Sequence, residues 1–196
     1  VCRELDIPVM YFSTDYVFDG QGEEPGMEDA PRDPLNVYGL TKAEGEEFVE
    51  AYPKHFIIRI SWVFGNNGSN FIKTMLKLGS TRKDLTVVDD QIGSPTYTYD
   101  LARLVVDMIQ TDKYGKYHAT NQGICSWYEF AREIFRQAGM DVNVSPVSSD
   151  AYPAKAKRPS NSRMNQTRLD ENGFERLPSW QDALSRYLVE IGQNRE

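Results

Sequence analysis

An apolar run that ends in hydroxyl residues, followed by a loop, a helix and a second apolar run, constrains the fold of this chain most. Residues 8–14 (Pro-Val-Met-Tyr-Phe-Ser-Thr) and 55–61 (His-Phe-Ile-Ile-Arg-Ile-Ser) predict buried strands, and 38–52 predicts a helix between them. Buried strands that alternate with helices are typical of a parallel sheet in an α/β protein. Because such sheets bind ligands at the carboxyl ends of their strands, we expect a site near Thr14.

A tyrosine and a lysine lie one turn apart at the start of the predicted helix, which Asn36 is placed to cap. In the motif Tyr-Gly-Leu-Thr-Lys at 38–42, both side chains project from one helix face. A neighbouring cation favours the ionised form of a phenol, so Tyr38 can exchange a proton with an alcohol or a carbonyl. The hydroxyl of Thr14 can give the same oxygen a second hydrogen bond. This combination predicts carbonyl reduction or alcohol oxidation. The spacing alone also fits a surface helix, because the chain has eleven tyrosines.

Composition narrows the functional classes. With 196 residues, 40% hydrophobic and 26% charged, the chain has the material for an ordinary globular core. A net charge of -7 gives no general attraction to nucleic acid, and no apolar run is long enough to cross a bilayer. The two cysteines indicate neither a disulfide framework nor a metal site, and we expect a cytoplasmic protein without metal. His118 fits a hydrogen-bonded core histidine better than a catalyst.

Five motifs occur along most of the chain. They are Phe-Ser-Thr-Asp-Tyr-Val-Phe at 12–18, Tyr-Gly-Leu-Thr-Lys at 38–42, Arg-Ile-Ser-Trp-Val-Phe at 59–64, Asp-Gln-Ile-Gly-Ser-Pro-Thr at 90–96 and Arg-Pro-Ser-Asn-Ser-Arg at 158–163. In these motifs and their order, the chain resembles the extended short-chain dehydrogenase/reductases, and within them the dTDP-4-dehydrorhamnose reductase branch. The resemblance implies a Rossmann-type fold and NADPH or NADH as cofactor.

The resemblance also implies residue roles. Tyr38 would donate the proton, and Thr14 would polarise the ketone. Lys42 would tune the acidity of Tyr38 and hold the nicotinamide ribose. Further candidates for substrate binding are Asp15 and Trp62 at the deoxysugar nucleotide, Gln91 and Thr96 along the cleft, Asn70 (first a helix N-cap), and Arg158 or Arg163 at the diphosphate.

The expected reaction is reduction of the C4 ketone of dTDP-4-dehydro-L-rhamnose to dTDP-L-rhamnose. Related dehydratases carry an Asp-Glu pair after the threonine, because elimination of water needs its own acid and base. Here Asp15 is followed by Tyr16, which favours hydride transfer alone. Two alternatives stay open: a reductase of another nucleotide-linked 4-ketosugar, and a non-catalytic binding protein like the regulatory subunit of methionine adenosyltransferase.

The start of the chain predicts a truncation. Val1 is not an initiator methionine, and residues 1–5 look like the last turn of a helix. The nearest Gly-rich turn, Gly20-Gln21-Gly22, follows no strand, so we assign no dinucleotide fingerprint to this chain. An open strand edge and exposed apolar surface would then favour dimerisation, and a homodimer stays open.

We therefore expect an incomplete Rossmann-type parallel sheet with flanking helices, plus a small α/β substrate-binding region. The nucleotide-binding half would comprise residues 1–63 and 99–122, and the substrate-binding region 64–98 and 123–196. Residues 145–161, rich in proline and serine and carrying Lys155, Lys157 and Arg158, predict a loop. Ser126 and Glu129 predict a capping box at the start of a helix.

Overall fold

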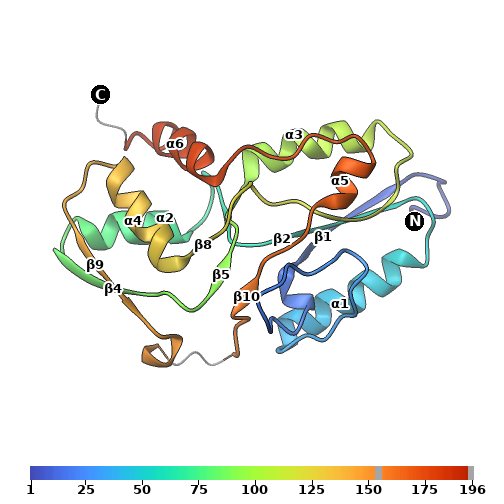
Figure 1. Ribbon diagram of the computed structural model, residues 1–196. Coiled ribbons are helices and arrows are strands. Elements are labelled where there is room, and N and C mark those ends of the chain that lie inside the picture. Colours follow the sequence, from blue (N-terminus) through green and yellow to red (C-terminus); the bar gives the residue numbers. More distant parts are fainter. Residues whose placement is uncertain (153–155, 194–196) are drawn as a thin grey trace.

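The computed structural model describes residues 1–152 and 156–193, which form an α/β structure (Figure 1). Three parallel strands carry helices on both faces, and a second group of helices and short strands lies beside them. Lys155 lies outside the described residues. In the described part of the chain, no helix has the length and apolar character needed to cross a bilayer.

The central sheet has the strand order β1-β2-β7, and all of its pairs are parallel. Its strands are β1 (Val9–Thr14), β2 (His55–Ile60) and β7 (Gly115–His118). Helix α1 (Val37–Glu50) connects β1 to β2 on one face, and α3 (Thr98–Ile109) covers the other (Figure 1). The register pairs Thr14 with Ile60, so the carboxyl ends of β1 and β2 meet at one edge. The predicted strand, helix and strand are therefore confirmed.

The second group is built from three helices and three small sheets. Three further short elements belong neither to these nor to the central sheet. The helices are α2 (Phe71–Gly79), α4 (Trp127–Gln137) and α6 (Trp180–Glu190). The small sheets are β3 (Val63–Phe64) with β6 (Thr96–Tyr97), β4 (Asp84–Val88) with β9 (Asn143–Val147), and β5 (Ile92–Gly93) between β10 (Asn161–Ser162) and β8 (Cys125–Ser126). The short elements are the 3-10 helices η1 (Asp15–Val17) and η2 (Ser149–Ala151), and α5 (Thr167–Glu171).

Two hydrophobic cores result. The first lies between the central sheet, α3 and α5, and the second joins α2, α4 and α6. The predicted division of the chain into a nucleotide-binding half (residues 1–63 and 99–122) and a substrate-binding region (64–98 and 123–196) stays a prediction. Leu169 and Phe174, which it assigns to the substrate-binding region, pack into the first core, against the sheet.

The prediction of a loop throughout 145–161 was wrong at its start. Residues 145–147 belong to β9, which pairs with β4 so that Leu85 lies opposite Val144 and Val87 opposite Pro146. The proline hid the strand in the sequence, since it cannot donate a ladder hydrogen bond, but an edge strand tolerates it. At residues 1–5, where the sequence predicted the last turn of a helix, the structure has a turn rather than a helix. The Leu5 amide donates to the Val1 carbonyl there.

A buried ion pair ties α1 to the sheet. Arg59 of β2 is 1% exposed and donates from Nε and Nη2 to the two carboxylate oxygens of Glu46, at 2.8 and 2.6 Å. Burial alone would raise the pKa of Glu46, but the hydrogen bonds and charge of Arg59 outweigh it and lower that pKa. The remaining nitrogen of Arg59, Nη1, donates to the Glu28 carbonyl and faces His118 Nε2 at 3.3 Å.

His118 is a neutral core histidine, as predicted. It is fully buried, and its Nδ1 lies 2.7 Å from the Asn165 carbonyl. Because Arg59 donates toward Nε2, the ring proton belongs on Nδ1, where the carbonyl accepts it. Burial and the charge of Arg59 lower the pKa of His118 to about 3.

We predict that Glu46→Gln destabilises the fold by about 3 kcal/mol, because it leaves the buried guanidinium of Arg59 without its counter-charge. Urea unfolding followed by circular dichroism measures the change. Glu47→Gln is the matched control: its side chain is 66% exposed and its oxygen lies 3.7 Å from Arg32, so we expect a change within about 0.5 kcal/mol. Equal losses in the two variants would contradict a special role for the buried pair.

Candidate functional site

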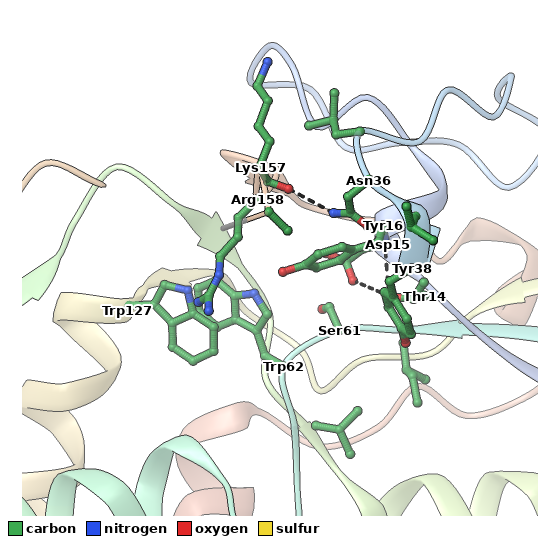
Figure 2. Close-up of a pocket in the computed structure, with 15 residues that line it drawn as sticks. Thr14, Asp15, Tyr16, Asn36, Tyr38, Ser61, Trp62, Trp127, Lys157 and Arg158 are labelled. Atoms are coloured by element: carbon green, nitrogen blue, oxygen red, sulfur yellow. Dashed lines mark hydrogen bonds between the residues drawn. The ribbon is translucent and has the colours of Figure 1, made fainter. Parts of the chain in front are cut away.

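A cleft of about 860 Å³ opens at the carboxyl ends of β1 and β2, beside the first turn of α1 (Figure 2). It therefore lies at the edge of the sheet where the sequence predicted a site. The residues that line it are Thr14, Asp15, Tyr16, Leu35, Asn36, Val37, Tyr38, Ile60, Ser61, Trp62, Val63, Trp127, Ala156, Lys157 and Arg158.

Tyr38 and Lys42 lie one turn apart on α1, as predicted. Tyr38 is about half exposed, and its ring meets the edge of Tyr16 with 5.6 Å between centroids. The Lys42 ammonium is fixed by the sheet: it donates to the Phe12 carbonyl at 2.8 Å and lies 4.7 Å from the centre of the Tyr11 ring. This arrangement holds a positive charge beside the first strand, on the helix that carries the phenol.

Tyr11 supports Lys42 in a way that the sequence analysis missed. Its hydroxyl lies 3.5 Å from the Lys42 carbonyl, and a Cβ at Gly45 would come 2.3 Å from that hydroxyl, so the glycine makes room for it. Burial raises the pKa of Tyr11, and the negative charge of Glu46 raises it further. The ring therefore stays neutral and presents its electron-rich face to the ammonium.

Thr14 and Asp15 form a buried polar pair at the end of β1. The Thr14 hydroxyl donates to Asp15 Oδ1 at 2.9 Å and accepts from the Tyr16 amide at 3.3 Å. Asp15 is 3% exposed, and its Oδ2 has no hydrogen-bond partner among the described residues. Burial raises the pKa of Asp15 to about 6, against the opposing effect of the hydrogen bond from Thr14. Asp15 thus gives the cleft a buried carboxyl group in which Oδ1 is hydrogen-bonded and Oδ2 is not.

Trp62 follows β2 and forms a stacked pair with Trp127. The ring centroids are 3.7 Å apart and the planes differ by 14°. Trp62 has φ +49°, a conformation that residues other than glycine rarely adopt, and it directs the ring against Gly93, where a Cβ would come 2.9 Å from it. Trp127 is the first residue of α4, whose predicted capping box of Ser126 and Glu129 is confirmed. The pair therefore forms a packed wall of the cleft.

Arg158 reaches the same wall from the C-terminal part of the chain. Its side chain points toward the Trp62 and Trp127 rings (Figure 2). The residue before it, Lys157, accepts a hydrogen bond at its carbonyl from Asn36 Nδ2 at 2.9 Å. Arg158 thus brings a positive charge to the mouth of a cleft whose other end contains Tyr38.

A larger cavity of about 1170 Å³ shares Trp127, Ala156, Lys157 and Arg158 with the cleft. The predicted substrate residue Gln91 lines this second cavity rather than the cleft itself. The other lining residues come from α2, β4 and the segment around η2: Phe71, Met75, Leu78, Thr86, Val87, Val88, Ser149, Asp150, Ala151 and Tyr152, with Gln21 and Ser160. Arg158 therefore lies between two neighbouring spaces.

Two predicted substrate residues lie elsewhere. Asn70 caps α2 through a bond from the Lys73 amide, and its Nδ2 donates to the Gly65 carbonyl and the Tyr187 hydroxyl. Thr96 is fully buried and donates to the Ser61 carbonyl at 2.6 Å. Their polar groups are occupied by the fold, so among the described residues neither lines the cleft or the cavity beside it.

Comparison with known proteins gives one matching family model, described as the RmlD substrate binding domain, over residues 1–192. Two similar curated proteins are the spore coat polysaccharide biosynthesis protein SpsK of Bacillus subtilis and the dTDP-4-dehydrorhamnose reductase of Escherichia coli K12. The first is 46% identical over 92% of this chain and 64% of the relative, and the second 40% identical over 96% and 67%.

A solved structure, the dTDP-4-dehydrorhamnose reductase of Bacillus anthracis in complex with NADP, superposes with a TM-score of 0.92 at 46% identity. The alignment covers 95% of this chain and 67% of that one. The chain thus spans about two thirds of the length of the relatives it matches. The Rossmann-type α/β fold predicted from the sequence is confirmed by this likeness.

We predict that Asp15→Asn stabilises the protein in a pH-dependent way. Because the folded-state pKa is raised from 3.8 to about 6, the folded protein binds the proton more tightly than the unfolded chain. Its contribution to stability is present at low pH and is lost as pH rises through about 6. The advantage of the asparagine variant should therefore grow by up to about 3 kcal/mol between pH ~4 and pH ~7.

Urea unfolding of both proteins across this pH range measures the difference. His118 and Glu46 act in the opposite direction, but they are common to both proteins and cancel in the comparison. A constant difference across the range would show that Asp15 titrates at its ordinary pKa.

Proposed function

The chain belongs to the RmlD substrate-binding domain family, and from this premise we propose that it is the catalytic and substrate-binding part of a reductase. The reaction is reduction of the C4 ketone of dTDP-4-dehydro-L-rhamnose to dTDP-L-rhamnose, with NADPH or NADH as the reductant. One observation carries the proposal: Tyr38 and Thr14 line one cleft at the carboxyl ends of β1 and β2, and Lys42 lies one turn from Tyr38 on α1, with its ammonium on the Phe12 carbonyl of β1. Relatives named for this reaction, at about two thirds coverage of their length, support it.

The donors beside β1 fit a nicotinamide ribose. Tyr38 and Lys42 lie one turn apart on α1, and a phenol hydroxyl and an ammonium can both donate hydrogen bonds to ribose hydroxyls. Lys42 and Tyr38 would hold this ribose, and the nicotinamide ring attached to it would supply the hydride when the cofactor is bound. Lys42 keeps its place through Phe12 and Tyr11, which are part of the chain itself.

Tyr38 gives its hydroxyl proton to the ketone oxygen as that oxygen becomes an alcohol. Lys42 carries a positive charge one turn further along the same helix. Thr14 donates a second hydrogen bond to the same ketone oxygen. To do so, its hydroxyl has to leave Asp15 Oδ1, which accepts its proton in this structure.

The rest of the nucleotide sugar follows the remaining lining residues. Trp62 provides an apolar wall for the deoxysugar, with Trp127 packed behind it. Arg158 clamps the diphosphate through forked hydrogen bonds, and Gln91 contributes from the neighbouring cavity. Asn70 and Thr96 act on the site through the fold, since their polar groups are already hydrogen-bonded.

The substrate and the compartment are also part of the proposal. The partner is a dTDP-sugar rather than nucleic acid or a membrane, and the cytoplasm is where this biosynthetic substrate would be met. Apolar side chains are exposed just before β1 at Ile7, on β1 at Phe12, and on α1 at Val37, Leu40 and Phe48. Light scattering of the purified chain tests whether this surface leads to a homodimer.

We predict that Tyr38→Phe abolishes turnover, by a factor of at least about 100, and leaves dTDP affinity within about twofold, because it removes only the proton donor. Absorbance of the reduced nicotinamide measures turnover, and calorimetry measures binding of dTDP. Both the chain and a chimera that supplies the uncovered part of the Bacillus anthracis relative should be assayed.

Tyr99→Phe is the control, since this exposed tyrosine lies outside the cleft. Full activity of the Tyr38 variant would overturn the mechanism. Turnover of other 4-ketosugars in preference to dTDP-4-dehydrorhamnose would favour the related reductases. Binding of dTDP without turnover in any form would favour a regulatory subunit, against which the presence of Thr14, Tyr38 and Lys42 argues.

A further inference from the structure

Asn36 uses both ends of its side-chain amide. Its Oδ1 accepts from the Gly39 amide at 2.9 Å and caps α1, while its Nδ2 donates to the Lys157 carbonyl at 2.9 Å. The two partners fix the orientation of the amide, because one is a donor and the other an acceptor. A single side chain thus links the start of the Tyr38 helix to a segment 121 residues later in the sequence.

The segment that Asn36 holds carries Arg158, and it is attached again on the far side of that residue. Ser160 Oγ and the Asn161 amide both donate to the Gly20 carbonyl, at 2.9 and 3.0 Å. Pro159 packs directly on Gly20, where a Cβ would come 2.2 Å from the proline side chain. Arg158 is therefore presented by a segment anchored at both ends to the part of the chain that contains the cleft.

Of these two attachments, the hydrogen bond from Asn36 to Lys157 is the one next to Tyr38. Asn36 lies two residues before Tyr38 and Lys157 one residue before Arg158, and all four line the cleft (Figure 2). The hydrogen bond from Asn36 to Lys157 thus sets the separation between the proton donor and the arginine. Without it, the Arg158 segment would keep its attachment to Gly20 but lose its attachment to α1.

We propose that Asn36 is a positioning residue for the substrate: it holds the Arg158 segment against α1, so that the diphosphate is bound at a fixed distance from Tyr38. The inference rests on the proposed function, since it takes a nucleoside diphosphate as the group that Arg158 binds. An ordinary N-cap would account for the Gly39 hydrogen bond but not for the bond to Lys157.

Asn36→Ser separates the two roles. Serine caps a helix about as well as asparagine, but its short hydroxyl cannot cap α1 and also donate to the Lys157 carbonyl. We expect unchanged melting temperature and helix content, with dTDP binding to the chain about fivefold weaker by calorimetry, the effect of one lost hydrogen bond. Asn36→Asp keeps the cap, lacks the donor, and should weaken binding at least as much.

A double-mutant cycle with Arg158→Gln tests whether Asn36 acts through the arginine. If it does, Asn36→Ser should have no further effect on dTDP affinity once Arg158 is replaced. A general loss of helix stability would weaken binding in both backgrounds. Ser179→Ala, which removes the cap of α6 far from the cleft, controls for cap loss: it should lower the melting temperature and leave dTDP affinity unchanged.

The outcomes are distinct. An unchanged dTDP affinity of Asn36→Ser, or an equal loss in the Arg158→Gln background, would overturn the positioning role while the proposed function stands. Failure of the unmodified chain to bind dTDP would instead count against the proposed function itself.

Discussion

The buried pair of Glu46 and Arg59 is the interaction on which the site depends. It joins the middle of α1 to β2, and Lys42 adds a second link from α1 to the Phe12 carbonyl of β1. Two charged links from one helix to two neighbouring strands leave α1 little freedom to slide or rotate. The position of Tyr38 at the first turn of that helix follows from them, and so does its distance from Thr14 at the end of β1.

The pairing of β1 with β2 sets the rest of the cleft. With Thr14 opposite Ile60, the residues just beyond each strand, Asp15 and Trp62, emerge at the same edge. The left-handed backbone at Trp62 then turns its ring toward Trp127. Trp127 is the first residue of α4, a helix of the second core. Backbone strain of this kind costs roughly 1–3 kcal/mol, and the stacking with Trp127 and the fit against Gly93 offset it.

Sequence patterns predicted those parts of the structure that depend on neighbours in the chain. The strands, α1 with its Asn36 cap, and the capping box at Ser126 follow from local periodicity and capping chemistry, and the structure has them. The loop prediction for 145–161 was wrong at 145–147 because β9 is stabilised by β4, far away in sequence, and carries a proline. The alternating apolar residues Leu85 and Val87 mark β4 in the sequence, and the need of that strand for a hydrogen-bonding neighbour is the signal that could have found β9.

The contacts of the site that sequence reasoning missed are all long-range. Tyr11 supports Lys42 from another element, Trp127 meets Trp62 across 65 positions of the numbering, and Asn36 reaches Lys157. Each of these residues had a sufficient local explanation as a strand residue, a helix start or a cap. A residue with a satisfied local role gives the sequence no reason to assign it a second one, and only the fold shows that its remaining atoms are in use.

Charge explains why these long-range contacts matter in this protein. The chain carries a net charge of -7, so the nucleotide diphosphate proposed as substrate would meet general repulsion at a distance and would need local positive charge to bind. Arg158 brings such a charge to the lining of the cleft, and Lys42 holds a second one beside β1, one turn along α1 from Tyr38. Asp15, a carboxyl group that lines the cleft, has its pKa raised by burial to about 6, so protonation removes part of the opposing charge in mildly acidic solution. The site therefore depends on two cations at fixed positions, and the neutral contacts from Tyr11, Phe12 and Asn36 are what fix them.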